Sequence, residues 1–229
     1  MESKTTIVEL QGVIKNYRQG ALDVPALRGL DLSVQKGEFT AISGPSGSGK
    51  TTALNLIGAL DQPTEGVVKL EGHDLGQLSR STLSKLRRDR IGFVFQAYNL
   101  IPVLTAFENA ETVLALQGVS PKVRRKKVLD LLAEVGLEGM EHRTPDQLSG
   151  GQQQRVAIAR AIASDPAVVL ADEPTANVDS ETAEKILGIM EKLNRERGVT
   201  FIFSTHDPRV MQRARRNLRL VDGRVESDT

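Results

Sequence analysis

A glycine-rich run near residue 50 ends in a lysine and two hydroxyl side chains. It reads Gly44-Pro45-Ser46-Gly47-Ser48-Gly49-Lys50-Thr51, with Thr52 next, and it fits the spacing G-x-x-x-x-G-K-[ST]. Such glycines let successive backbone N–H groups converge on phosphate oxygens, and a following helix N-terminus adds partial positive charge. Lys50 would neutralise the outer phosphates, and the Thr51 hydroxyl would bind Mg²⁺. The run predicts a nucleoside triphosphate site.

Two adjacent carboxylates follow an apolar run later in the chain. Val168-Val169-Leu170-Ala171 is typical of a buried strand, and Asp172 and Glu173 come directly after it. Alone, such a pair is more often part of a helix start or a loop, but the glycine-rich run in the same chain favours a catalytic role for the two carboxylates. We assign Asp172 to Mg²⁺ and Glu173 to general-base catalysis, because hydrolysis needs a group that orients water and accepts its proton. The Asn-Lys-x-Asp segment of guanine recognition does not occur, so ATP is expected.

A serine-glycine turn with the features of an anion receptor precedes a long helical pattern. The segment is Leu148-Ser149-Gly150-Gly151-Gln152-Gln153-Gln154-Arg155, and the helical pattern covers 150–164. A serine hydroxyl and free amides at a helix N-terminus favour an anion, with a dipole contribution of about 0.3–1 kcal/mol. Without other context this turn would more often be an ordinary helix start.

This turn and its helix carry a specific resemblance. Leu-Ser-Gly-Gly-Gln followed by Gln-Gln-Arg-Val-Ala-Ile-Ala-Arg-Ala resembles the signature motif of ABC-type ATPases, the nucleotide-binding domains of ABC transporters. The resemblance extends over residues 6–225, with further motifs in the family's order. They are Tyr17 for the aromatic that stacks on adenine, Gln96 for the Q-loop, Asn177-Val178-Asp179 for the D-loop, and His206 for the switch histidine.

The resemblance implies roles for these residues. Glu173, His206 and Gln96 would be catalytic, and Thr51, Gln96 and Asp172 would hold Mg²⁺. The nucleotide contacts would come from Tyr17, the run Gly44 to Thr52, Ser149, Gly150, Gly151, Gln152 and Asp179. In this family the signature of one copy faces the P-loop of another, so a head-to-tail, ATP-dependent homodimer is implied.

Other segments are similar to the LolD/MacB/FtsE group of this family. They are Tyr98 to Asn109, His142-Arg143 with Pro145, and Asp23 to Leu30. Ala176 and Val178 depart from the Gly and Leu common in that group, and neither supplies a ligand side chain. The group implies a membrane permease partner with a large extracytoplasmic domain, for lipoprotein release or for macrolide or peptide export. An FtsE-like ATPase that transmits a mechanical signal without a cargo is the alternative.

The pattern of apolar residues indicates how these motifs are positioned. Strands are expected at 6–13, 27–34, 39–43, 67–70, 91–95, 168–171 and 199–204, helices at 51–60, 106–117, 122–135, 150–164 and 180–197, and a hairpin with an Asp-Gly turn at 218–225. The alternation predicts an α/β P-loop core with a substantial parallel portion and an N-terminal β subdomain. We expect one ABC ATPase domain over 1–229, with an inserted helical subdomain at approximately 97–160.

The composition and length of the chain argue against several other classes of protein. The 229 residues include 30 basic and 29 acidic side chains and no cysteine. Because these charges nearly cancel, the protein has no net positive electrostatic field that would attract nucleic acid, and no nucleic-acid partner is expected. DNA-repair and chromosome-organising ATPases insert long coiled coils, and translation-factor ABC proteins usually carry two ATPase units; this chain shows neither feature. No apolar run approaches the roughly 20 residues that span a bilayer. We expect a cytoplasmic protein held at the inner face of the membrane by its partner.

Overall fold

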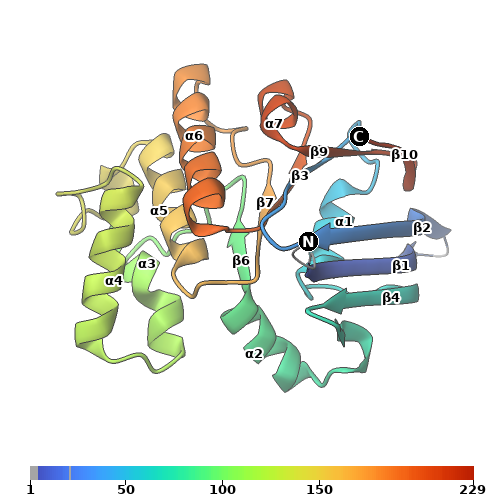
Figure 1. Ribbon diagram of the computed structural model, residues 1–229, viewed down its shortest axis with the longest axis horizontal. Coiled ribbons are helices and arrows are strands. Elements are labelled where there is room, and N and C mark those ends of the chain that lie inside the picture. The colour runs from blue at the N-terminus through green and yellow to red at the C-terminus, as the bar shows by residue number, and fades with distance from the viewer. Residues whose placement is uncertain (1–4, 21) are drawn as a thin grey trace.

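A six-stranded and a four-stranded β-sheet organise the computed structural model, which describes residues 5–20 and 22–229 (Figure 1). The larger sheet has the order β10-β9-β3-β8-β7-β6. Its strands are β3 (Phe39–Ser43), β6 (Ile91–Val94), β7 (Val168–Asp172), β8 (Phe201–Thr205), β9 (Arg216–Val221) and β10 (Arg224–Asp228). Neighbours from β9 to β6 are parallel, and β10 closes an antiparallel hairpin on β9. The predicted α/β fold and the C-terminal hairpin are confirmed.

The smaller sheet is antiparallel and comes from the N-terminal part of the chain. It has the order β2-β1-β4-β5, with β1 (Thr6–Gln19), β2 (Leu22–Gln35), β4 (Glu65–Leu70) and β5 (His73–Asp74). The two predicted N-terminal strands are confirmed, but both continue much further towards their shared turn. The extension escaped prediction because the first residues of β2 are exposed and Pro25 interrupts the short apolar alternation of Leu22 and Val24.

The core lies on both faces of the larger sheet. Val169 and Ala171 of β7 face one hydrophobic cluster, whereas Val168 and Leu170 face the other, as the two-residue period of a strand requires. One cluster fills the space between the two sheets around α1 (Lys50–Ile57). The other packs under α3 (Ala106–Leu116), α4 (Pro121–Glu134), α5 (Gly150–Ile162) and α6 (Ser180–Arg197). These five helices confirm the predicted ones within a few residues, and α3, α4 and α5 gather on the side away from the smaller sheet (Figure 1).

Two helices were not predicted, α2 (Arg80–Arg90) and α7 (Pro208–Arg213). Helix α2 buries only Leu83, so its sequence lacks an apolar stripe. Helix α7 is too short for periodicity, and its only local signal is the Asp207 cap before Pro208. Short 3-10 turns occur at Leu75–Gln77 and Pro145–Gln147. Within the described part of the chain, no helix has the length and apolar character needed to cross a bilayer.

Candidate active site

Four neighbouring parallel strands carry predicted catalytic motifs at their carboxyl ends. Gly44 follows β3, His206 follows β8, Asp172 ends β7, and Gln96 lies two residues beyond β6. Because these strands are adjacent in the order β3-β8-β7-β6, their carboxyl ends share one edge of the sheet. Sheet order therefore brings together motifs as far apart in the sequence as Gly44 and His206.

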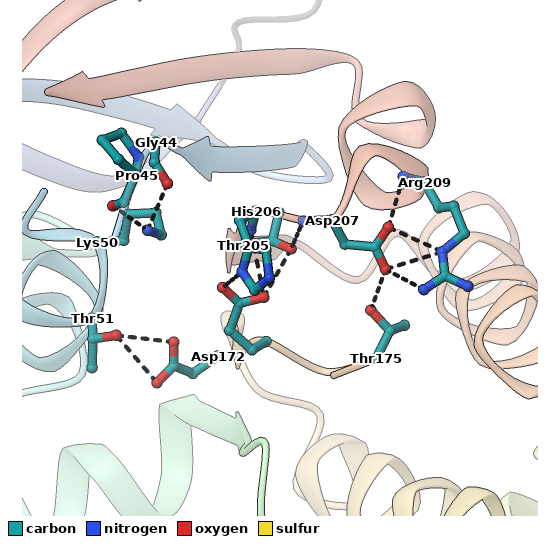
Figure 2. Close-up of polar contacts among 11 residues, drawn as sticks. Gly44, Pro45, Lys50, Thr51, Asp172, Thr175, Thr205, His206, Asp207 and Arg209 are labelled. Carbon is teal, nitrogen blue, oxygen red and sulfur yellow. Dashed lines mark hydrogen bonds and ion pairs between the residues drawn. The ribbon is translucent and has the colours of Figure 1, made fainter. Parts of the chain in front are cut away.

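The glycine-rich run wraps around the ammonium group of Lys50. Lys50 Nζ donates hydrogen bonds to the carbonyl oxygens of Gly44, at 2.8 Å, and Pro45, at 2.9 Å (Figure 2). Its position in the first turn of α1 adds this charge to the positive end of the helix. The buried Ser48 Oγ has no hydrogen-bond partner among the described residues. An orphan buried hydroxyl and a buried ammonium fit a phosphate ligand.

A cleft of about 640 Å³ opens over this run, a size that suits a small-molecule ligand. It is lined by Ala26, Pro45, Ser46, Gly47, Gly49, Lys50, Thr51, Thr52, Gln96, Glu173, Ala176 and His206. All of them except Ala26 and Ala176 are predicted site residues. The cleft thus joins the phosphate-binding run to the predicted catalytic groups.

The Thr51 hydroxyl and the Asp172 carboxylate face each other across the floor of the site. Thr51 Oγ1 lies 3.2 Å and 3.4 Å from the two carboxylate oxygens of Asp172 (Figure 2). Among the residues that the structure describes, no group of three or more His, Cys, Asp or Glu side chains could hold a metal alone. A hydroxyl and one carboxylate fit Mg²⁺, which binds through few protein oxygens and completes its shell with water and substrate phosphates.

Glu173 and His206 form the closest polar contact of the site. Glu173 Oε1 lies 2.6 Å from His206 Nδ1, and Thr205 Oγ1 donates to Glu173 Oε2 at 3.1 Å. Glu173 adopts a left-handed backbone conformation, with φ of 45°. Strain of this kind persists only where its surroundings enforce it and often marks functional residues. The His206 side chain is 73% exposed, so it can rotate away from Glu173 without unpacking the core.

A second polar cluster joins the segment after Glu173 to the start of α7. The Thr175 hydroxyl donates to Asp207 Oδ2 at 2.8 Å, and Arg209 donates to both carboxylate oxygens of Asp207 (Figure 2). Burial acts to raise the pKa of Asp207, but the hydrogen bonds from Arg209 and Thr175 hold it below its usual range. Sequence analysis missed this cluster, since its members resemble ordinary helix-cap and loop residues.

Gln96 connects to the D-loop through its backbone. Asn177 Nδ2 donates to the Gln96 carbonyl at 2.9 Å, and the Tyr98 hydroxyl donates to the Asn177 carbonyl at 3.1 Å. Arg160 of α5 donates to the carbonyls of Tyr98, at 2.9 Å, and Asn99, at 2.6 Å. Burial lowers the pKa of Arg160, and both residues that it contacts have positive φ. The helix after the signature turn therefore holds the Q-loop, a link that no local pattern indicated.

The signature turn and Asp179 lie outside this cleft. Ser149 Oγ accepts from the backbone N–H of Gln152, whose side chain accepts from the Ser149 N–H, so the turn forms a capping box at the start of α5. The Asp179 side chain caps α6 by accepting from the Thr182 N–H. Neither element lines the site of its own chain.

Tyr17 lies in β1, beside the cleft rather than in its lining. Its hydroxyl donates to Asp61 Oδ2 at 2.9 Å, and the Lys15 ammonium lies 4.9 Å from the centre of its ring. Burial raises the pKa of Tyr17, the Asp61 hydrogen bond acts in the same direction, and the nearby Thr52 side chain opposes them. The ring is therefore next to a residue that does line the cleft.

Replacing Gly44 with Ala is expected to damage the phosphate-binding run. Gly44 has φ of 144°, and an added Cβ would lie 2.1 Å from the Leu220 carbonyl oxygen. Strain and overpacking together should cost about 2–5 kcal/mol of unfolding free energy and weaken ATP binding. Thermal unfolding and calorimetric ATP titration measure both effects. Gly47→Ala is the matched control for the loss of stability, because its φ is also positive but no atom lies within 4 Å of the new Cβ; equal losses of unfolding free energy in both variants would contradict the steric argument.

Comparison with known proteins identifies the family. Residues 27–176 match the ABC transporter family, and the chain is 48% identical to the lipoprotein-releasing system ATP-binding protein LolD of Anaeromyxobacter dehalogenans over 98% of this chain and 94% of that protein. The chain belongs to the ABC transporter family. It is an ABC-type ATPase, and the predicted resemblance to the LolD/MacB group is confirmed.

Further matches concern a solved structure and two longer proteins. The dimeric cassette MJ0796 bound to ADP and Pi superimposes with a TM-score of 0.90 at 48% identity, covering 97% of this chain and 98% of that one. A protein of that name comes from Methanocaldococcus jannaschii. The macrolide export ATP-binding/permease protein MacB of Syntrophobacter fumaroxidans is 48% identical over 97% of this chain. The ABC ATPase spans only 32% of that MacB and 35% of the one from Marinobacter nauticus.

Proposed function

We propose that this ABC ATPase uses ATP binding and hydrolysis to drive a membrane permease subunit of the lipoprotein-release or macrolide-export type. The observation that carries the proposal is the Glu173–His206 contact in the cleft that also holds Lys50 and Thr51. The similarity to LolD and MacB supports this type of assembly. On this proposal the chain is cytoplasmic and bound to the inner face of the membrane through its partner, with no nucleic acid involved.

The hydrolytic step follows from the side chains of the cleft. The phosphates lie on the glycine-rich run and Lys50, while Thr51, Asp172 and Gln96 would hold Mg²⁺. Bound there, Mg²⁺ supplies positive charge that offsets the charge developing on the phosphoryl oxygens. Glu173 orients the attacking water and takes its proton once His206 has turned from the carboxylate towards the γ-phosphate. The contact seen between Glu173 and His206 is then the resting arrangement of the base.

The second half of each site comes from another copy. Ser149, Gly150, Gly151 and Gln152 lie away from their own cleft, and so does Asp179. In a head-to-tail homodimer these residues of one copy complete the site of the other. The dimeric state of the similar MJ0796 cassette supports this arrangement.

The permease would dock beside the Q-loop. A groove of about 350 Å³ lies there, lined by residues that include Leu60, Phe93, Phe95, Asn99 and Arg160. Of the apolar stretch 100–107, Leu100 and Phe107 pack on the core, whereas Ile101 and Val103 are exposed. We propose that a helix of the permease binds in this groove. We also propose that the chain is a single domain over 1–229, within which residues 97–160 form a helical subdomain.

The base of the nucleotide would stack on Tyr17. Tyr17→Ala is expected to raise the Kd for ATP about five- to 150-fold, because base–aromatic stacking contributes about 1–3 kcal/mol. The pH dependence of turnover should stay as in the unmodified protein, since Tyr17 takes no part in proton transfer. Calorimetric titration and a pH–rate profile measure these outcomes. An unchanged Kd would leave Tyr17 with a packing role only.

A pull-down from detergent-solubilised membranes of the source cell tests the membrane assignment. Tagged Glu173→Gln protein with ATP and Mg²⁺ would serve as bait, so that the closed dimer persists. Recovery of a membrane protein with a large extracytoplasmic domain is expected, and the identity of that protein would separate export or lipoprotein release from FtsE-like signalling. Recovery of soluble partners alone would contradict the proposal.

A further inference from the structure

The ring of Tyr17 is anchored by an ion pair that the hydrolytic mechanism does not use. Lys15 Nζ donates to Asp61 Oδ1 at 2.7 Å and to the Gln62 carbonyl at 2.8 Å, while the Tyr17 hydroxyl donates to the other oxygen of Asp61. The Lys15 and Asp61 side chains are only 12% and 31% exposed. One carboxylate therefore holds both the ring's hydroxyl and the cation that lies 4.9 Å from the ring centre.

Asp61 is itself tied to the helix that begins at the phosphate site. It follows α1 closely, and its backbone N–H donates to the carbonyl of Asn55 in that helix at 3.3 Å. The loop after it is fixed to β1, because the Thr64 N–H donates to the Ile14 carbonyl at 2.8 Å and the Asn16 N–H donates to Thr64 Oγ1 at 3.0 Å. The aromatic ring and the phosphate-binding end of α1 thus share one rigid frame.

We propose that Asp61 and Lys15 are positioning residues that fix the Tyr17 ring relative to α1 and thereby set the affinity of the site for the nucleotide base. The proposal rests on the stacking role proposed above for Tyr17. It follows from the pairing geometry, because a ring held at its hydroxyl and near its face loses little freedom when a base stacks on it. The phosphates bind at the start of α1, whereas Asp61 follows the end of that helix. The affinity for phosphates should therefore not depend on the Lys15–Asp61 ion pair.

The test compares two ligands on the intact protein. ATP with Mg²⁺ contains the base, whereas inorganic tripolyphosphate with Mg²⁺ offers phosphates alone. Asp61→Ala is expected to raise the Kd for ATP about three- to tenfold, as part of the stacking contribution is lost, and to change the Kd for tripolyphosphate less than about twofold. Lys15→Met, which retains an apolar stem, should act in the same direction as Asp61→Ala.

Tyr17→Phe provides a second variant that keeps the ring and removes only its anchor. It should raise the Kd for ATP, and in the Asp61→Ala background it should add little, because both changes delete the same hydrogen bond. Glu111→Ala is the matched control, since it breaks the Glu111–Arg124 pair, which is also mostly buried, within the α3–α4 region. It should leave both Kd values unchanged.

Three results would overturn the inference, and they are distinguishable. Equal weakening of ATP and tripolyphosphate by Asp61→Ala would mean that the pair acts on the phosphate site. Loss of ATP affinity in Tyr17→Ala but not in Asp61→Ala or Tyr17→Phe would mean that the ring needs no anchor. Unchanged ATP affinity in Tyr17→Ala would remove the stacking role itself, and the positioning role with it.

Discussion

ATP hydrolysis by the Glu173→Gln variant is expected to fall about 10²–10⁴-fold, because the amide cannot accept the proton of the attacking water. ATP binding should persist, since Lys50, Thr51 and the glycine-rich run are unchanged. Glutamine has the shape of glutamate and can still accept the hydrogen bond that Thr205 donates to Glu173. The variant should accumulate as a closed dimer with ATP. Phosphate release, ATP titration and size-exclusion chromatography measure these three outcomes.

Glu181→Gln is the control for this change. Glu181 is an exposed glutamate in the first turn of α6 and pairs with Lys185 on the surface. A surface pair of this kind contributes little, so both hydrolysis and the monomer–dimer distribution should stay normal. Hydrolysis by Glu173→Gln at the rate of the unmodified protein would disprove the assignment of Glu173 as the base.

Lys50→Ala is expected to abolish high-affinity ATP binding. Each charge-assisted hydrogen bond to a phosphate oxygen contributes about 1.5–3 kcal/mol, so losing two would raise the Kd roughly 10²–10⁴-fold. The variant also loses the hydrogen bonds from Lys50 Nζ to the carbonyls of Gly44 and Pro45, which shape the glycine-rich run. Calorimetric titration with ATP measures the affinity, and circular dichroism checks that the fold survives.

A control substitution at a lysine outside the site shows whether the loss of one positive charge alone weakens ATP binding. Lys85 is exposed on α2, and Lys85→Ala removes the same charge without touching the cleft. It should bind ATP as the unmodified protein does. If the folded Lys50→Ala protein kept its ATP affinity, the glycine-rich run would not be the phosphate site.

Lys50 and Glu173, the two residues substituted above, differ in how the surrounding residues hold their side chains. The Lys50 side chain is buried against the carbonyl groups of the glycine-rich run, whereas Glu173 contacts a histidine that is largely exposed. The phosphate-binding group is therefore in place before the ligand arrives. In the proposed mechanism, Glu173 acts as the base only after His206 moves, and the backbone of His206 is continuous with the Thr175–Asp207–Arg209 cluster. Binding and hydrolysis can thus be separated by single substitutions.

Local motifs were accessible to prediction because backbone chemistry alone defines them. The glycine-rich run, the helix start at Ser149 and the Asp222-Gly223 hairpin each need only the residue types within a few positions. Strands buried on both faces, such as β7 and β8, were also visible as short apolar runs. Helix α2 was not, since a polar helix that buries only Leu83 carries no periodic signal.

The sequence by itself predicted the family, through the resemblance of its motifs, and it predicted ATP and the groups expected to bind phosphate from residue types at fixed local spacing. Only the tertiary structure showed which of the distant side chains contact one another. Thr51 faces Asp172 across 121 positions, Glu173 contacts His206 across 33, and Tyr17 bonds to Asp61 across 44. Arg160 reaches the Q-loop because α5 packs beside β6. Such contacts depend on strand order and on helix packing against the sheet, which no short window of sequence encodes.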